Sequence, residues 1–271
     1  MTEAPELDAA IETCYAALRR CQAPHAPLDA CTYCCMDPAL ELQMRRMPLR
    51  QITARHFYGY NDAAKSAVQP TEELRYLVPR LLELVARGEE VHHSVELYLD
   101  RLGRREPGAF SPAEWASIQT LCEKLFAQRL TFYPWARPDQ ALLSSQFDLL
   151  LMFDIGGVDI APMLAHWLAT DTPESTLNYV ASSFWNCWYY GCADVSNAFA
   201  GDRPDYRARL WAWLDDAAHR AVWAERILQL DLDSVPGFAQ WQCGCRFTAC
   251  HMVEYTFDAL VARNCSANGD A

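Results

Sequence analysis

The sequence predicts an all-α fold of roughly ten helices, arranged either as an irregular α-solenoid of the HEAT kind or as a compact helical bundle. Three observations predict this class. Apolar residues recur at helical spacing, as in the row Leu7, Ile11, Cys14 and Leu18. Proline and glycine punctuate the apolar segments at short intervals. No stretch alternates apolar and polar residues for long, so there is little case for a sheet.

An internal similarity favours the solenoid. The pattern Leu-x-x-Trp-Leu occurs at Leu164–Leu168 and again at Leu210–Leu214, a spacing that fits a repeated helical pair. Hydrophobic residues make up 51% of the 271 residues and aromatic residues 12%, which is enough for a true core and argues against disorder. We expect a single domain over residues 1–265 and a disordered tail over residues 266–271.

Capping residues place the helices of the first part of the chain. Asp37 followed by Pro38 is a helix start, because aspartate caps free N–H groups and proline fits the first helical position. Thr53 and Thr71 are further caps, and Glu72 and Glu73 favour the positive end of a helix. The helices are expected over residues 6–22, 37–48, 53–68, 71–88 and 91–102.

The clearest start signal in the remaining chain is Ser111-Pro112-Ala113-Glu114, which combines a cap serine, a first-turn proline and a capping-box glutamate. Gly156-Gly157 marks the end of a strongly apolar helix, and Thr172-Pro173-Glu174 starts a long one. The helices are expected over residues 111–131, 140–153, 161–169, 172–200, 204–230 and from Pro236-Gly237 to Arg263.

The formal net charge of −12 bears on partners and compartment. An acidic protein repels phosphate backbones, so we expect no nucleic-acid partner and favour a basic protein partner. The segment Phe147–Ile155 is interrupted by Asp148 and Asp154, so no membrane span is expected, and the acidic N-terminus is not a signal peptide. The protein is therefore predicted to be cytoplasmic, with its twelve cysteines reduced.

Two cysteine groups have spacings that suggest a metal site. Cys31-x-x-Cys34-Cys35 resembles a zinc-binding loop, and Cys243-Gly-Cys245 is followed closely by Cys250-His251. The candidate ligands of a structural zinc ion are Cys31, Cys34, Cys243 and Cys245. The rival interpretation is that these thiols are core fillers of a cysteine-rich chain. A redox role is disfavoured because no βαβ pattern surrounds the Cys-x-x-Cys sequence.

No catalytic or cofactor-binding constellation is visible. Asp154 and Asp159 flank a glycine pair, but a C-cap glycine and an N-cap aspartate are the favoured explanation of this loop. His92 and His93 are adjacent, so on a helix they would point about 100° apart and would not easily share a ligand. The aromatic segment Phe184–Tyr190 and the residues Trp211, Trp213 and Trp223 are interpreted as core rather than as a binding surface. The assignment as an enzyme therefore stays open, with binding favoured.

The order of Cys31-x-x-Cys34-Cys35, then Pro48-Leu49-Arg50, then the helix segment Leu77–Val85 resembles a group of uncharacterised bacterial proteins. The resemblance covers residues 31–102 and implies a soluble bacterial helical protein, with no known activity to carry over. This chain has Thr32-Tyr33 between its cysteines, where the group has a Gly-Cys-Pro-Cys-Cys type of loop.

The sequence thus favours a soluble bacterial binding protein: an immunity protein or antitoxin that neutralises a basic toxin domain by direct contact. Its motivation is the acidic charge, the helical scaffold and the lack of catalytic groups. The alternatives are a zinc-dependent enzyme or factor built on the Cys31–Cys35 loop, and a helical scaffold or adaptor.

Overall fold

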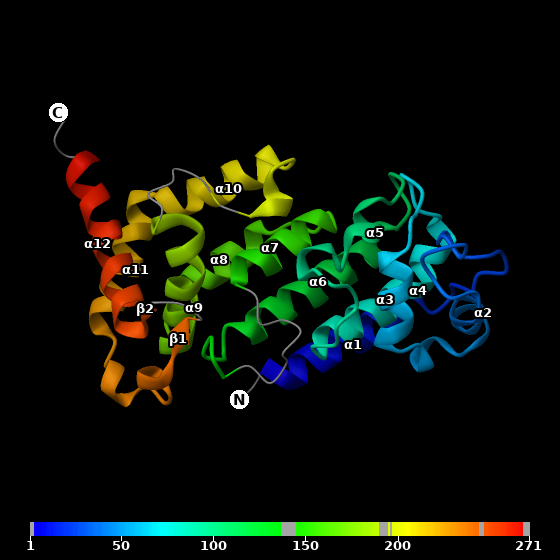
Figure 1. Cartoon of the computed structure of the whole chain (residues 1–271), viewed down its shortest axis with the longest axis horizontal. Helices are drawn as coiled ribbons and strands as arrows, with labels where there is room; N and C mark the ends of the chain where they lie inside the picture. Colours follow the sequence, from blue (N-terminus) through cyan, green and yellow to red (C-terminus); the bar gives the residue numbers. More distant parts are fainter. Residues whose placement is uncertain (1–2, 137–144, 190–194, 196, 244–246, 268–271) are drawn as a thin grey trace. The chain divides into compact units, whose positions relative to one another are not determined.

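The computed structural model describes the chain except residues 1–2, 137–144, 190–194, 196, 244–246 and 268–271 (Figure 1). Within the described residues it contains 12 α-helices and one pair of two-residue strands. The predicted all-α class is confirmed. The choice between a solenoid and a bundle stays a prediction.

The chain forms two compact units. The first comprises Met1–Gln128, Pro138–Ser144 and Asp148–Ile160; the second comprises Arg129–Arg137, Ser145–Phe147 and Ala161–Ala271. The single domain predicted for residues 1–265 stays a prediction. Of the predicted tail, residues 266–267 end the last helix, and residues 268–271 lie outside the described part.

The first unit is organised around a central helix, α4, which packs against α1 and also contacts α3 and α5. The broad apolar stripe predicted for α4 is buried, including Leu77, Leu81 and Val85. The elements of this unit are α1 (Glu3–Leu18), α2 (Pro38–Arg46), η1 (Leu49–Gln51), α3 (Ala54–Asp62), α4 (Thr71–Ala86), η2 (Val95–Leu97), α5 (Asp100–Gly103), and most of α6 (Pro112–Arg129) and α7 (Gln146–Ile155).

In the second unit, α12 packs against α9 and α11, and α10 against α11. Strands β1 and β2 pair antiparallel, with Cys243 opposite Phe247. The elements are α8 (Ala161–Ala169), α9 (Pro173–Ser183), the π-helical turn η3 (Phe184–Trp188), η4 (Ala198–Ala200), α10 (Pro204–Asp215), α11 (Ala217–Gln229), η5 (Leu232–Ser234), η6 (Phe238–Gln240), β1 (Gln242–Cys243), β2 (Phe247–Thr248) and α12 (Ala249–Ala267).

Most of the predicted helix starts are confirmed, but the predicted Thr71 cap was wrong, because Thr71 is the first residue of α4 itself. The Asp37 carboxylate accepts a hydrogen bond from Ala39 N at 2.8 Å. Ser111 and Glu114 form the predicted capping box: Ser111 N donates to Glu114 Oε2 at 2.8 Å, and Glu114 N donates to Ser111 Oγ at 3.3 Å. Thr172 caps α9 through Ser175 N. Such caps involve residues two or three positions apart, so the local sequence is enough to reveal them.

Several helix lengths were predicted wrongly. Helix α3 ends at Asp62 rather than Val68, because the following segment is held extended by contacts with other parts of the unit. The helix expected over 204–230 is two helices: Asp216 is extended, with φ −61° and ψ 126°, and caps α11. The helix expected over 172–200 leaves α-geometry after Ser183.

The tryptophans of the two Leu-x-x-Trp-Leu segments meet in the core of the second unit. Trp167 and Trp213 stack with ring centroids 5.6 Å apart. Tyr179 and Trp223 stack beside them at 4.2 Å. Close aromatic pairs add to the stabilisation that comes from burying their area. The core interpretation is therefore confirmed for Trp213 and Trp223, and it also holds for Phe184 and Trp188, which are buried.

Candidate functional site: a cysteine loop

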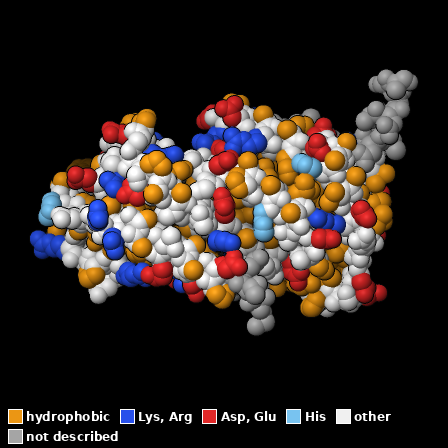
Figure 2. Space-filling model, turned by 180° about the vertical axis from the view of Figure 1, so that it is seen from behind, with side chains coloured by type: hydrophobic (Ala, Val, Ile, Leu, Met, Phe, Trp, Pro, Cys, Tyr) orange, Lys and Arg blue, Asp and Glu red, His pale blue; other side chains and the backbone are white. Residues whose placement is uncertain are grey.

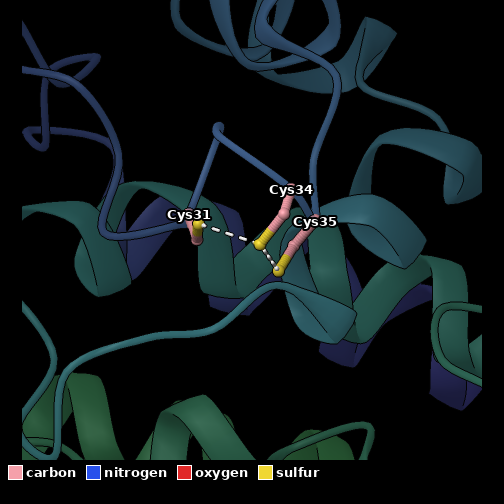
Figure 3. Close-up of side chains that lie close together, drawn as sticks. All are labelled: Cys31, Cys34 and Cys35. Atoms are coloured by element: carbon pink, nitrogen blue, oxygen red, sulfur yellow. Dashed lines mark hydrogen bonds between the residues drawn. The ribbon is translucent and has the colours of Figure 1, made fainter.

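The loop between α1 and α2 gathers three thiols at the surface of the first unit (Figure 3). Residues 32–35 form a turn, which Met36 N closes by donating to Cys31 O at 3.0 Å. The Sγ atoms of Cys31 and Cys34 lie 3.6 Å apart, and those of Cys34 and Cys35 lie 3.3 Å apart. All three sulfurs fall within 4.8 Å of one another, so they can ligate one ion.

The cysteine loop is open to solvent. Cys34 and Cys35 are exposed and Cys31 is half-buried. Tyr33, at the tip of the turn, is 98% exposed and contributes nothing to the core. The arrangement therefore suits a small ion rather than an enclosed organic molecule.

The backbone of the turn stabilises negative charge on one sulfur. The N–H groups of Cys34 and Tyr33 point at Cys31 and lower the pKa of its thiol to about 7. The pKa of Cys34 is raised to about 11, because its thiol hydrogen bonds with Cys35 and Cys31 and a charge there would face theirs. The thiolate is the form of cysteine that binds metal, so Cys31 is the natural first ligand.

The start of the cysteine loop is tied to the rest of the unit. Cys31 N donates to Ala64 O at 2.9 Å. Asp29 N donates to Glu73 Oε2 at 3.0 Å, and the Asp29 carboxylate accepts from Ser66 N at 2.9 Å. These bonds join the loop to α4 and to the segment after α3. They hold the backbone at Cys31 in place without using any of the three sulfurs.

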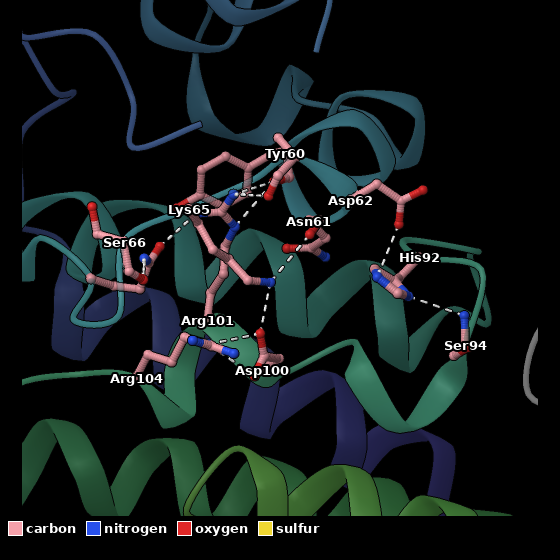
Figure 4. A network of polar contacts seen from close by, with 12 residues as sticks. Tyr60, Asn61, Asp62, Lys65, Ser66, His92, Ser94, Asp100, Arg101 and Arg104 are labelled. Atoms are coloured by element: carbon pink, nitrogen blue, oxygen red, sulfur yellow. Dashed lines mark hydrogen bonds and ion pairs between the residues drawn. The ribbon is translucent and has the colours of Figure 1, made fainter. Parts of the chain in front are cut away.

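A buried arginine completes this anchor (Figure 4). Arg101, 1% exposed, donates to Asp29 O at 2.7 Å and to Gln69 Oε1 at 2.5 Å. It also donates to Tyr60 O, and its guanidinium lies 3.7 Å from the Tyr60 ring centroid. The Tyr60 hydroxyl in turn donates to Glu73, whose pKa is raised chiefly by burial. One side chain thus links the end of α3 to the cysteine loop.

The predicted metal ligands have different outcomes. The structure brings Cys31 and Cys34 together as predicted, and it adds Cys35, which the predicted ligand set left out. Cys35 directly follows Cys34 in the same turn, and this position was the signal that could have added it to the predicted ligand set. The side chain of Cys243 and the whole of Cys245 lie outside the described residues, so their part in the site stays a prediction.

A second cluster lies at the end of α3. Asp62 Oδ1 is 2.9 Å from His92 Nε2 and 3.1 Å from His93 Nδ1. The expectation that the two histidines could not easily share a partner was wrong, because residues 91–94 are not helical. Outside a helix the rings lie together, with centroids 4.1 Å apart.

The bonding of His92 argues against a metal at this second cluster. His92 is buried, and its Nδ1 accepts a hydrogen bond from Ser94 N at 3.0 Å. A neutral ring that accepts at Nδ1 carries its proton on Nε2, and that proton points at Asp62. A metal-bound Nε2 requires the opposite tautomer, in which Nδ1 donates. Burial also lowers the pKa of His92, which favours the neutral ring.

The Asp154–Asp159 loop has a structural explanation. Gly157 has φ 74°, and its N–H donates to Asp154 O while Val158 N donates to Phe153 O. This is the left-handed cap that ends many helices. Arg105 donates to Gly156 O at 3.0 Å. The glycine pair therefore ends α7, as its simpler interpretation predicted.

No extended acidic surface is evident on the face shown in Figure 2, where acidic and basic side chains are interspersed. Among the described residues, no helix is both long and apolar enough to cross a membrane. Comparison of the chain with known protein families, with curated proteins and with solved structures found no match.

Proposed function

We propose that this protein binds one transition-metal ion, zinc in the first instance, through the thiolates of Cys31, Cys34 and Cys35. The observation that carries the proposal is the convergence of the three sulfurs within 4.8 Å. Zinc–sulfur bonds of about 2.3 Å place the sulfurs of a tetrahedral site about 3.8 Å apart. The separations of 3.6 and 3.3 Å need little adjustment to reach that arrangement.

The anchored backbone supports the same proposal. A loop that is already held by Arg101, Glu73 and Asp29 loses little further conformational entropy when it takes up an ion. The proposal accounts for three ligands, which leaves a fourth position for water or for another donor. The earlier prediction that Cys243 and Cys245 complete the site is compatible with this proposal but is not required by it.

The first test is elemental analysis of the reduced protein, with thiol titration on the same sample. We expect about one zinc ion per chain, and protection of Cys31, Cys34 and Cys35 from alkylation when the ion is bound. The matched control is Cys250→Ser, which removes an exposed thiol in the second unit. Metal-free protein that takes up no zinc from a buffered solution would refute the proposal.

A second proposal follows from the charge of −12: the protein neutralises a basic toxin domain as an immunity protein or antitoxin. Complementary charge speeds association and makes it sensitive to salt. The test is binding of a basic domain encoded beside this gene, measured by calorimetry at low and high salt. If no such neighbour binds under either condition, the scaffold or adaptor alternative is preferred.

A further inference from the structure

The three thiols of the cysteine loop are not equivalent as disulfide partners. Cys34 is the middle member, with its sulfur near both others. Adjacent residues joined by a trans peptide have Cα atoms about 3.8 Å apart, which is below the roughly 4.4 Å that an unstrained disulfide requires. A bond between Cys34 and Cys35 would therefore distort the backbone. Residues three apart across a turn have Cα atoms up to about 7 Å apart, within the disulfide range.

We propose that peroxide oxidises Cys31 and Cys34 to a reversible disulfide, and that this bond expels the metal ion from the cysteine loop. The second half of the proposal rests on the function proposed above; the first half does not. The geometry that carries it is the 3.6 Å separation of the two sulfurs in an exposed turn. Closing that gap to the bonded distance of about 2.0 Å takes a small movement of the turn.

The chemistry balances with one peroxide molecule. One sulfur of the pair attacks a peroxide oxygen: an S–O bond forms, the O–O bond breaks, and the departing hydroxide takes a proton to become water. The second sulfur then attacks this sulfenic acid, so that an S–S bond forms and the S–O bond breaks. The hydroxyl leaves as another water, with the proton of the second thiol in the metal-free loop or with a proton from solvent when the sulfurs start as metal-bound thiolates. Two thiols lose two electrons and the peroxide gains them.

Loss of the metal follows from the ligand chemistry. A disulfide sulfur carries no negative charge and is a poor ligand, so only Cys35 would still bind as a thiolate. A single thiolate ligand binds zinc too weakly to keep the ion bound when the protein is diluted. The anchors of the loop use the backbone of Cys31 and the side chains of Asp29, Glu73 and Arg101, so they survive the oxidation and keep the turn ready to rebind.

The experiment uses the full-length reduced protein loaded with zinc. Hydrogen peroxide is added, the released zinc is followed with a colorimetric chelator, and the disulfide is located by peptide mass mapping. We expect one zinc ion released for each Cys31–Cys34 bond formed, and recovery of binding after dithiothreitol. The variant Cys35→Ser retains the pair and is expected to form the same disulfide. The variant Cys31→Ser should form no disulfide within the loop.

The outcomes separate the two proposals. Reduced protein that takes up no zinc but still forms the Cys31–Cys34 bond refutes the metal function and the expulsion, and it leaves the disulfide standing. Reduced protein that binds zinc and keeps it under peroxide refutes the inference alone. Mapping of the bond to Cys34–Cys35, or to a partner outside the loop, also overturns the inference.

Discussion

The cysteine loop and the Asp62–His92–His93 cluster both bring three ligand side chains of the first unit within reach of one ion. The two clusters differ in the bonds that their ligand side chains already make. The sulfurs of the loop interact with one another and with N–H groups of their own turn, while its anchors are made by the backbone and by other residues. In the second cluster each ring of the pair is already bonded to Asp62, and His92 also holds Ser94 N. Proximity of ligand atoms is thus a weaker indicator of a metal site than lone pairs that remain uncommitted.

The largest effect is expected from Arg101→Met, because Arg101 supports the end of α3 and the cysteine loop together. Removing its charge leaves several buried acceptors without a donor, at a cost of about 3–5 kcal/mol in the free energy of unfolding. The measurement is urea denaturation. The control is Arg104→Met, which removes a more exposed guanidinium paired with Asp100 and should cost less than about 1 kcal/mol. Equal losses in the two variants would contradict the role given to Arg101.

The comparison between the clusters is tested directly by two variants. Cys34→Ser should weaken zinc binding by at least about 100-fold, because it removes a ligand from the centre of the site. His92→Gln should leave the affinity and the stoichiometry unchanged. Both are measured by competition with a chelator of known affinity. Loss of zinc in His92→Gln, with retention in Cys34→Ser, would reverse the assignment of the metal site.

A smaller effect is expected in the pH dependence of stability. The folded-state pKa of His92 is lowered by burial, and the groups around it are Asp62, His93 and Lys65. Below its ordinary pKa of 6.5 the unfolded chain binds more protons at this position than the folded chain does. The contribution of His92 to stability is therefore complete above pH 6.5 and is lost as the pH falls below it.

The check is urea denaturation at a series of pH values, for the wild type and for His92→Gln. The wild type should lose stability on acidification more steeply than the variant. Other titrating groups, including His56, are common to both proteins and cancel in the difference. Parallel curves would show that His92 is not the titrating group.

The smallest effect concerns the reactivity of Cys31 in the metal-free protein. With a pKa of about 7, half of its thiol is ionised at neutral pH, although a more acidic thiolate is also a weaker nucleophile. The two effects together predict alkylation about 3-fold faster than for a thiol with the reference pKa of about 8.5. The rate at Cys31, followed by peptide mass spectrometry, should level off above pH 7. A rate that keeps rising to pH 9 would contradict the stabilisation of this thiolate.

The sequence was sufficient where structure depends on near neighbours. The limits of α8 and the capping box of α6 were predictable because their signals lie within a few residues. The Cys-x-x-Cys spacing revealed the thiol site for the same reason. The end of α3 was not predictable, because Asp29 and Arg101 hold the segment that follows it from distant positions. The pairing of His92 with His93 was missed because it depends on the absence of a helix at residues 91–94.

The bond from Arg101 to Asp29 spans 72 residues, and this separation has a consequence for biosynthesis. At about 5–20 residues per second, a ribosome needs roughly 4–14 s to proceed from Asp29 to Arg101. During that interval the three thiols have left the ribosome, or are leaving it, without the arginine that anchors their loop. On the nascent chain, the loop that carries these thiols is therefore less ordered than in the finished protein. The thiols are therefore accessible to a metal ion or an oxidant before Arg101 can anchor their loop.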